Sequence, residues 1–161
     1  MLGRRFVNTS PLVFLARVGL LKMLREGATE VVVPEPVLLE IQAHGPDDPT
    51  MKAIHEVEWL KLVSVSEVDP EIDAWDLGPG ESAVLTLAAS EQGAWAVIDD
   101  REARRCARKL NIPVIGTLGL VLLAKQLGQV SLARPVIEHL RLSGMYLSDQ
   151  VINQALARVG E

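Results

Sequence analysis

The chain has 161 residues, which suits one compact domain, and 48% of them are apolar, which excludes an intrinsically disordered protein. Its formal net charge of −5 argues against a protein that holds nucleic acid through a large excess of positive charge. No uninterrupted stretch of about 20 apolar residues is present, so we expect neither a membrane span nor a secretory signal, and we predict a cytoplasmic protein. The single cysteine, Cys106, agrees with a reducing compartment, and its apolar neighbours predict a buried side chain.

Strands are predicted where apolar residues run together, and helices where they recur every three or four residues. A short strand covers residues 6–7, and Ser10-Pro11 predicts the start of an amphipathic helix that ends near Gly27, with Ser10 as its N-cap. The run Val31-Val32-Val33 predicts a strand covered on both faces, as in a parallel sheet. The next predicted elements are helices over 34–44 and 51–59, a strand over 60–65, a loop over 69–80, a helix over 81–92 that is buried nearly all round, a strand over 94–98, a helix over 101–110, a strand over 113–115 and a helix over 118–127.

This alternation predicts an α/β fold, a three-layer sandwich whose central, mainly parallel sheet has helices on both faces. Residues 128–161 predict a helical hairpin, with helices over 133–142 and 148–159. Because so short a segment cannot bury a core of its own, we expect a domain over 1–127 and a C-terminal extension over 128–161 packed on it. The apolar residues of the hairpin either fold back onto the core or form a surface for a homodimer or a partner; they are Leu140, Leu142, Met145, Leu147, Val151 and Ile152.

Polar side chains follow two of the predicted strands, at the carboxyl ends where open α/β sheets bind ligands. Asn8 follows the first strand, and the adjacent carboxylates Asp99 and Asp100 follow the fourth. An aspartate pair is unfavourable without a nearby cation, although an N-cap for the next helix would explain one of the two. Glu81 opens a helix with no other charge in its next nine residues, and Glu40 flanks the apolar stripe of the helix over 34–44. For these two, an ordinary surface or first-turn acid is the competing interpretation.

Carboxylates that arrive from separate elements at one sheet edge would form an oxygen-rich site suited to Mg²⁺ or Mn²⁺. Such a site activates water and neutralises a phosphodiester during its hydrolysis. The helix after the aspartate pair is basic, which is what the binding of a phosphate backbone beside metal ions requires, unless it is simply a solvated face paired with surface acids. Its basic residues are Arg101, Arg104, Arg105, Arg108 and Lys109.

Four segments of the sequence, together with its C-terminal region over 140–161, resemble a known family. The segments are Val7-Asn8-Thr9-Ser10-Pro11-Leu12, residues 34–40, Leu77-Gly78-Pro79-Gly80-Glu81-Ser82-Ala83, and Ile98-Asp99-Asp100-Arg101 with Ala103-Arg104. The chain resembles the PIN-domain family over nearly its whole length, and more closely the PIN-like proteins often described as toxins of type II toxin–antitoxin systems. PIN domains are small α/β proteins, typically metal-dependent ribonucleases in which three or four acidic residues hold Mg²⁺ or Mn²⁺.

The resemblance places the first acidic position on Asn8, the second on Glu40, the third on Glu81 and the last on Asp99 or Asp100. Asn8 departs from the pattern, because its neutral amide offers a metal ion only a carbonyl oxygen. The four carboxylates that remain are the predicted metal ligands.

The resemblance implies a Mg²⁺- or Mn²⁺-dependent endoribonuclease, a toxin that a small antitoxin holds inactive. Under this hypothesis Glu40, Glu81, Asp99 and Asp100 bind metal and water, and Asn8 positions a ligand or the scissile phosphate. The residues expected to contact the RNA are Ser10, Arg101, Arg104, Arg105 and Arg108. The alternative is a catalytically degraded PIN-like module that binds RNA or a protein partner without cleaving it.

Overall fold

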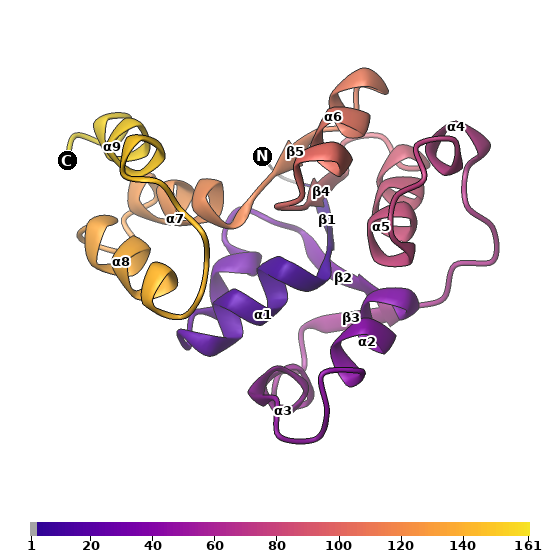
Figure 1. Cartoon of the computed structure of the whole chain (residues 1–161), viewed down its shortest axis with the longest axis horizontal. Helices are drawn as coiled ribbons and strands as arrows, with labels where there is room; N and C mark the ends of the chain where they lie inside the picture. Colours follow the sequence, from indigo (N-terminus) through magenta and orange to yellow (C-terminus); the bar gives the residue numbers. More distant parts are fainter. Residues whose placement is uncertain (1–2) are drawn as a thin grey trace.

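The computed structural model describes residues 3–161, in which five parallel strands form one sheet with helices on both sides (Figure 1). The strands are β1 (Arg4–Val7), β2 (Glu30–Pro34), β3 (Leu60–Val63), β4 (Trp95–Val97) and β5 (Val114–Ile115). Their order in the sheet is β3-β2-β1-β4-β5, and all neighbours pair in parallel. The predicted α/β architecture is therefore confirmed, while residues 1 and 2 of the predicted domain lie outside the described residues.

The strand order reverses between β1 and β4. From β1 the chain winds outward through β2 to β3, and it then returns to the other side of β1 for β4 and β5. Loops leave the carboxyl ends of β1 and β4 in opposite directions at such a point, which opens a crevice where α/β proteins bind ligands. The fold therefore places Asn8, after β1, and the aspartate pair, after β4, on either side of this crevice.

The helices fill the predicted positions with two differences. Their bounds are α1 (Thr9–Arg17), the 3₁₀ helix η1 (Leu21–Arg25), α2 (Glu35–Gln42), α3 (Pro49–Glu56), α4 (Pro70–Asp73), α5 (Pro79–Ala89), α6 (Arg101–Lys109), α7 (Thr117–Gln126), α8 (Arg134–Leu142) and α9 (Asp149–Ala157).

The single helix predicted over residues 10–27 is wrong, because Gly19 adopts a φ of +70° and separates α1 from η1. The N-cap of α1 is Asn8 and not Ser10, and its side chain makes no capping bond. The segment predicted as a loop over 69–80 contains α4, which Asp69 caps by accepting from the Glu71 N–H.

The core follows from the strand sequences. Val7, Val32 and Val97 are fully buried on the three central strands, where β-branched side chains pack well on both faces of the sheet. Helix α5 buries Ala83, Val84, Leu85 and Ala88 against β1, β2 and β4, as its apolar sequence predicts. Cys106 is also buried, which confirms its expected place as a small apolar residue, and burial raises the pKa of its thiol.

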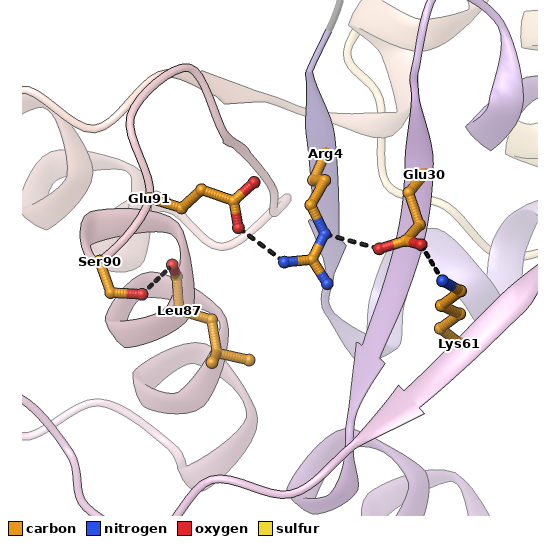
Figure 2. Close-up of polar contacts among 6 residues, drawn as sticks. All are labelled: Arg4, Glu30, Lys61, Leu87, Ser90 and Glu91. Carbon is orange, nitrogen blue, oxygen red and sulfur yellow. Dashed lines mark hydrogen bonds and ion pairs between the residues drawn. The ribbon is translucent and has the colours of Figure 1, made fainter.

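Ion pairs join the strands at the amino end of the sheet, away from the crevice (Figure 2). Arg4 on β1 donates to Glu30 on β2 and to Glu91 beyond α5, at 2.6 Å each. Lys61 on β3 also pairs with Glu30. Because each of these charges is balanced by a partner and partly exposed, this end of the sheet gains modest stability from them.

The C-terminal extension packs on α7, so that α7, α8 and α9 lie together at one end of the molecule (Figure 1). Leu140, Met145 and Ile152 are buried in the common core, whereas Leu142 and Val151 remain exposed. Glu161 accepts from the Ala133 and Arg134 N–H groups and so holds the end of α9 against the start of α8. Among residues 3–161, no helix is long and apolar enough to cross a membrane.

Candidate active site

Asn8 lines the crevice and lies directly after β1. Its backbone N–H donates to the Val97 carbonyl on β4 at 3.0 Å, which holds the residue in the sheet, and only 2% of its surface is exposed. Its side-chain Nδ2 donates to Glu81 Oε1 at 3.0 Å. Its Oδ1 is buried and accepts no hydrogen bond from the described residues. Buried amide oxygens are nearly always bonded, so this oxygen is available to a ligand.

Glu40 reaches the crevice from α2 and fastens two other elements to it. Its carboxylate accepts from Thr9 Oγ1 on α1 and, at 2.9 Å, from the Gly80 N–H at the start of α5. A Cβ atom at residue 80 would lie 2.8 Å from Asn8 Oδ1 and from both Glu40 oxygens, so any side chain there would force these groups to shift. The structure thus brings Glu40 close to Asn8, but the carboxylate is already engaged by donors from α1 and α5.

Glu81 occupies the first turn of α5, where the helix dipole favours a carboxylate. The turn Gly78-Pro79-Gly80 delivers it, since proline suits the first helical position and Gly80 permits the close approach to Glu40. Apart from the bond from Asn8, its oxygens accept nothing among the described residues. Glu81 therefore has oxygen atoms free to bind a ligand in the crevice.

Asp99 and Asp100 follow β4 and do different things. Asp100 is the N-cap of α6, where its Oδ1 accepts from the Ala103 N–H at 2.9 Å, as the competing sequence interpretation predicts. Asp99 accepts at 2.7 Å from both the N–H and the hydroxyl of Thr117, at the start of α7. Burial raises the pKa of Asp99 above its ordinary value, while the bonds from Thr117 and the charge of Arg104 oppose that rise.

A pocket of about 510 Å³ fills the crevice and unites several of the predicted residues. Asn8, Ser10, Glu81, Asp99 and Asp100 line it. Glu40 does not line the pocket, and it acts on the pocket through its hydrogen bonds from Thr9 and Gly80. The pocket therefore carries oxygen ligands on its inner wall from three separate elements, as the sequence predicts for the edge of the sheet.

Two donor side chains at the rim of this pocket were missed by sequence reasoning. Arg17 lies on the face of α1 that also carries Ser10, seven positions earlier, and His44 stands four positions after Glu40. His44 Nδ1 lies 3.3 Å from Asp48 Oδ2, and bonds from Thr50 and His44 hold the pKa of Asp48 below its ordinary value. Helical spacing from the predicted site residues is the signal that finds both of them.

The basic helix α6 contributes less to the crevice than its sequence suggests. Arg104 lies beside Asp99 and donates to the Ile98 carbonyl at 3.1 Å. Arg105 pairs with Glu102, and Arg108 donates to the Arg104 carbonyl. None of Arg101, Arg105 and Arg108 lines the acidic pocket. Of the five predicted RNA contacts, the structure brings only Ser10 and Arg104 close to the carboxylates.

The donor set fits a divalent cation only in a reduced form. Within residues 3–161, no three or more carboxylate, histidine or cysteine side chains come together closely enough to hold a metal ion. The four predicted ligands are thus not gathered into one cluster, because Glu40 is bonded to α1 and α5 and Asp100 caps α6. Asn8, Glu81 and Asp99 remain as oxygen-bearing residues that line one pocket, and Mg²⁺ commonly binds few protein oxygens and keeps several waters.

Comparisons with known proteins found a family and a similar solved structure. A family model described as "PIN domain" matches residues 5–161. Among solved structures, that of the PIN domain endonuclease Utp24 is similar, with a TM-score of 0.49 and 13% identity, covering 70% of this chain and 84% of that one. No curated protein matches the sequence.

Proposed function

We propose that this chain, which belongs to the PIN-domain family, is an endoribonuclease that depends on Mg²⁺ or Mn²⁺. Its membership of that family supports a nuclease-type function. The observation that carries the proposal is the buried, unbonded Oδ1 of Asn8, a residue that lines the same pocket as Glu81 and Asp99. These three oxygen-bearing residues follow β1, open α5 and follow β4, and they line the pocket at the switch point of the sheet.

In this proposal Asn8, Glu81 and Asp99 hold the ion, which activates water and neutralises the charge that develops on the phosphate. Thr117 fixes the orientation of the Asp99 carboxylate through two bonds, and Asn8 Nδ2 does the same for Glu81. Glu40 holds the first turn of α5 against α1 and thereby sets the distance between Asn8 and Glu81. Each protein ligand is thus oriented by a neighbour, as functional metal sites require.

Donor side chains of the lining would bind the substrate phosphates. Arg17, His44 and Ser10 line the same pocket as the carboxylates. Their N–H and O–H groups are suited to phosphate oxygens, and Arg17 adds a permanent positive charge. These donors would hold a phosphodiester beside the proposed metal ligands.

The resemblance to PIN-like toxins extends the proposal to a toxin that a small antitoxin restrains in the cytoplasm. It predicts that expression of the wild-type chain in bacteria slows growth, whereas expression of Asp99→Asn does not. Equal growth of the two cultures at equal protein levels would contradict the toxin role and leave the nuclease proposal to the test below. A homodimer through the extension stays a prediction, which gel filtration with light scattering can measure.

One observation favours a second candidate, a PIN-like module that binds RNA without cleaving it. Asn8 Nδ2 already satisfies one Glu81 oxygen, so the crevice needs no cation to stabilise that carboxylate. This candidate predicts RNA binding with no cleavage at millimolar Mn²⁺, and it also predicts that Asn8→Asp gains cleavage.

The proposed activity is tested by incubating the purified chain with structured RNA in Mn²⁺, in Mg²⁺ and in chelator. Glu81→Gln and Asp99→Asn keep the shape of the side chains but remove the charge, and Glu71→Gln on α4 is a matched control remote from the crevice. We expect cleavage that needs metal, survives in the control and is lost in both site variants. Cleavage that persists in chelator, or in both site variants, would overturn the proposal.

A further inference from the structure

A second groove, of about 540 Å³, lies beside the acidic pocket and is formed partly by the C-terminal extension. Residues of β5 and α7 line it together with the loop after α8 and with α9. Its lining is mixed: Leu118, Leu122, Leu147 and Val151 contribute apolar surface, and polar groups contribute nearly as much. The extension therefore does more than cover α7, since it leaves an open groove along it.

The groove adjoins the acidic pocket, because Phe14 and Asp99 line both. A nucleotide strand whose phosphate lies over Asp99 would therefore place an adjacent nucleotide in the groove. The groove is large enough for a base with its sugar and lies within one nucleotide of the proposed reaction centre.

Tyr146 stands at the groove in a position that folding does not explain. Its side chain is 93% exposed, although the preceding residue, Met145, is buried. It makes no hydrogen bond among the described residues, and it lines the groove. An exposed aromatic ring beside positive charge is the usual platform on which proteins stack the bases of single strands.

The charge of the groove suits an anionic ligand. Arg104 and Arg158 both line it, against one carboxylate, Asp99. Arg158 is exposed and has no ion-pair partner within residues 3–161, while Arg104 is held by the Ile98 carbonyl. Two guanidinium groups in the lining match the phosphates on either side of a nucleotide, whereas an apolar protein segment would leave Arg158 without a partner.

We propose that this groove is a base-binding subsite for single-stranded RNA, in which Tyr146 stacks on the base next to the scissile phosphate and Arg158 contacts the following phosphate. The inference rests on the proposed nuclease function, whose substrate it specifies as unpaired at this position. A paired base could not stack on Tyr146, because its faces are covered by its neighbours in the helix.

The single tyrosine of the chain permits a direct test without cleavage. Biosynthetic 3-fluorotyrosine places one ¹⁹F label, at Tyr146, and the labelled protein is titrated in chelator with a single-stranded oligoadenylate and with an RNA duplex of the same strand length that is long enough to stay paired. We expect a saturable shift of the ¹⁹F resonance with the single strand and none with the duplex. An unchanged resonance with the single strand, or equal shifts with both, would overturn the subsite.

Affinity measurements in chelator with fluorescent RNA supply matched variants. Tyr146→Ala should weaken binding by about five- to a hundred-fold, the range for removing one stacked base, and Tyr146→Phe should retain it. Leu142→Ala is the control, since Leu142 is 87% exposed on the same extension but does not line the groove. Arg158→Gln should lower the salt dependence of binding by about one ion, and Arg134→Gln, an exposed cation elsewhere on the extension, should not.

The two proposals fail in different ways. RNA that shifts the label and binds through Tyr146 without ever being cleaved would keep the subsite and refute the catalytic function. Metal-dependent cleavage with unchanged affinity in Tyr146→Ala would keep the nuclease and refute the subsite. Binding of a protein segment at the groove, with no response of the label to RNA, would refute the subsite as well.

Discussion

Replacement of Asn8 by aspartate tests the metal-binding role of the crevice most sensitively. The substitution removes the 3.0 Å bond from Asn8 Nδ2 to Glu81 Oε1 and sets two carboxylates in its place, in a site that is 2% exposed. The lost bond, which ends on a charged group, costs about 1.5–3 kcal/mol. The same change supplies the carboxylate that the PIN-domain pattern places at this position.

The repulsion between the two carboxylates sets the rest of the cost. Two unit charges 3 Å apart repel by about 5 kcal/mol at an effective dielectric constant of 20. The pair can relieve this by keeping one proton, which costs about 4 kcal/mol at pH 7, because a free aspartate ionises near pH 4 and each unit is worth about 1.4 kcal/mol. Part of this repulsion is relieved by movement of the side chains, so we expect Asn8→Asp to lose about 3–6 kcal/mol without metal.

Thermal unfolding in chelator and in Mn²⁺ measures both effects. A chain of this size loses about 2–4 °C of melting temperature for each kcal/mol, so the variant should melt roughly 10–20 °C below wild type in chelator. A bound divalent ion reverses the local sign of the charge, so Mn²⁺ should raise the melting temperature of the variant more than that of wild type. Asn153→Asp, on the exposed face of α9, is the control that should respond to Mn²⁺ as wild type does. A variant that is destabilised equally with and without Mn²⁺ would refute the proposal that Asn8 and Glu81 share a cation.

Two further substitutions test the supports of the crevice, and a third tests the bonds that join Arg5 on β1 to the end of η1. Gly80→Ala forces a methyl group against the Glu40 carboxylate. We expect a loss of about 1–3 kcal/mol in the free energy of unfolding and RNA cleavage that is roughly 100-fold slower, with a native circular dichroism spectrum. Cleavage at the wild-type rate would contradict the close approach of Gly80 to Glu40. Thr117→Val removes a hydroxyl bond that lowers the pKa of Asp99, so the already raised pKa rises further. In metal-free protein the substitution should lower the free energy of unfolding by about 1–3 kcal/mol at pH 7, because a raised carboxyl pKa destabilises the folded state once the pH exceeds the pKa of the unfolded chain. The loss should shrink below about pH 4. Urea unfolding at both pH values measures this loss, and an equal loss at both would contradict the role of the Thr117 hydroxyl in stabilising the Asp99 carboxylate. Arg5→Met removes a buried guanidinium that donates to three backbone carbonyls at the end of η1, so urea unfolding should show a loss of about 2–4 kcal/mol, and a change below about 0.5 kcal/mol would contradict this role.

Local patterns in the sequence predict most of the fold. The run of valines in β2 and the nearly uncharged sequence of α5 indicate burial by themselves, and the carboxyl ends of β1 and β4 follow from the alternation of elements. The predicted length of the first helix is wrong, because an isolated glycine is tolerated inside a helical pattern and does not by itself mark a helix end. In the structure Gly19 adopts the left-handed conformation of a helix C-cap, and the N–H groups of Gly19 and Leu20 donate to the Ala16 and Leu15 carbonyls.

In the candidate site, too, local sequence patterns predict some features, and contacts between distant residues determine the others. The cap formed by Asp100 is a local rule, and it separates the roles of the two adjacent aspartates. The position of Glu40 depends on contacts with Thr9 and Gly80, which are 31 and 40 residues away along the chain. Sequence reasoning from spacing alone could not tell that this carboxylate is engaged by hydrogen bonds, and so it counted Glu40 as a free metal ligand.

A crystal structure of the wild-type chain soaked in Mn²⁺ tests the central claim most directly. Anomalous scattering identifies manganese without ambiguity, and the acidic pocket is open to solvent through its rim. We predict a manganese ion bonded to Asn8 Oδ1, Glu81 and Asp99, with Glu40 still bonded to Thr9 and Gly80. A crevice without manganese at millimolar Mn²⁺, or an ion that does not contact Asn8 Oδ1, would contradict it.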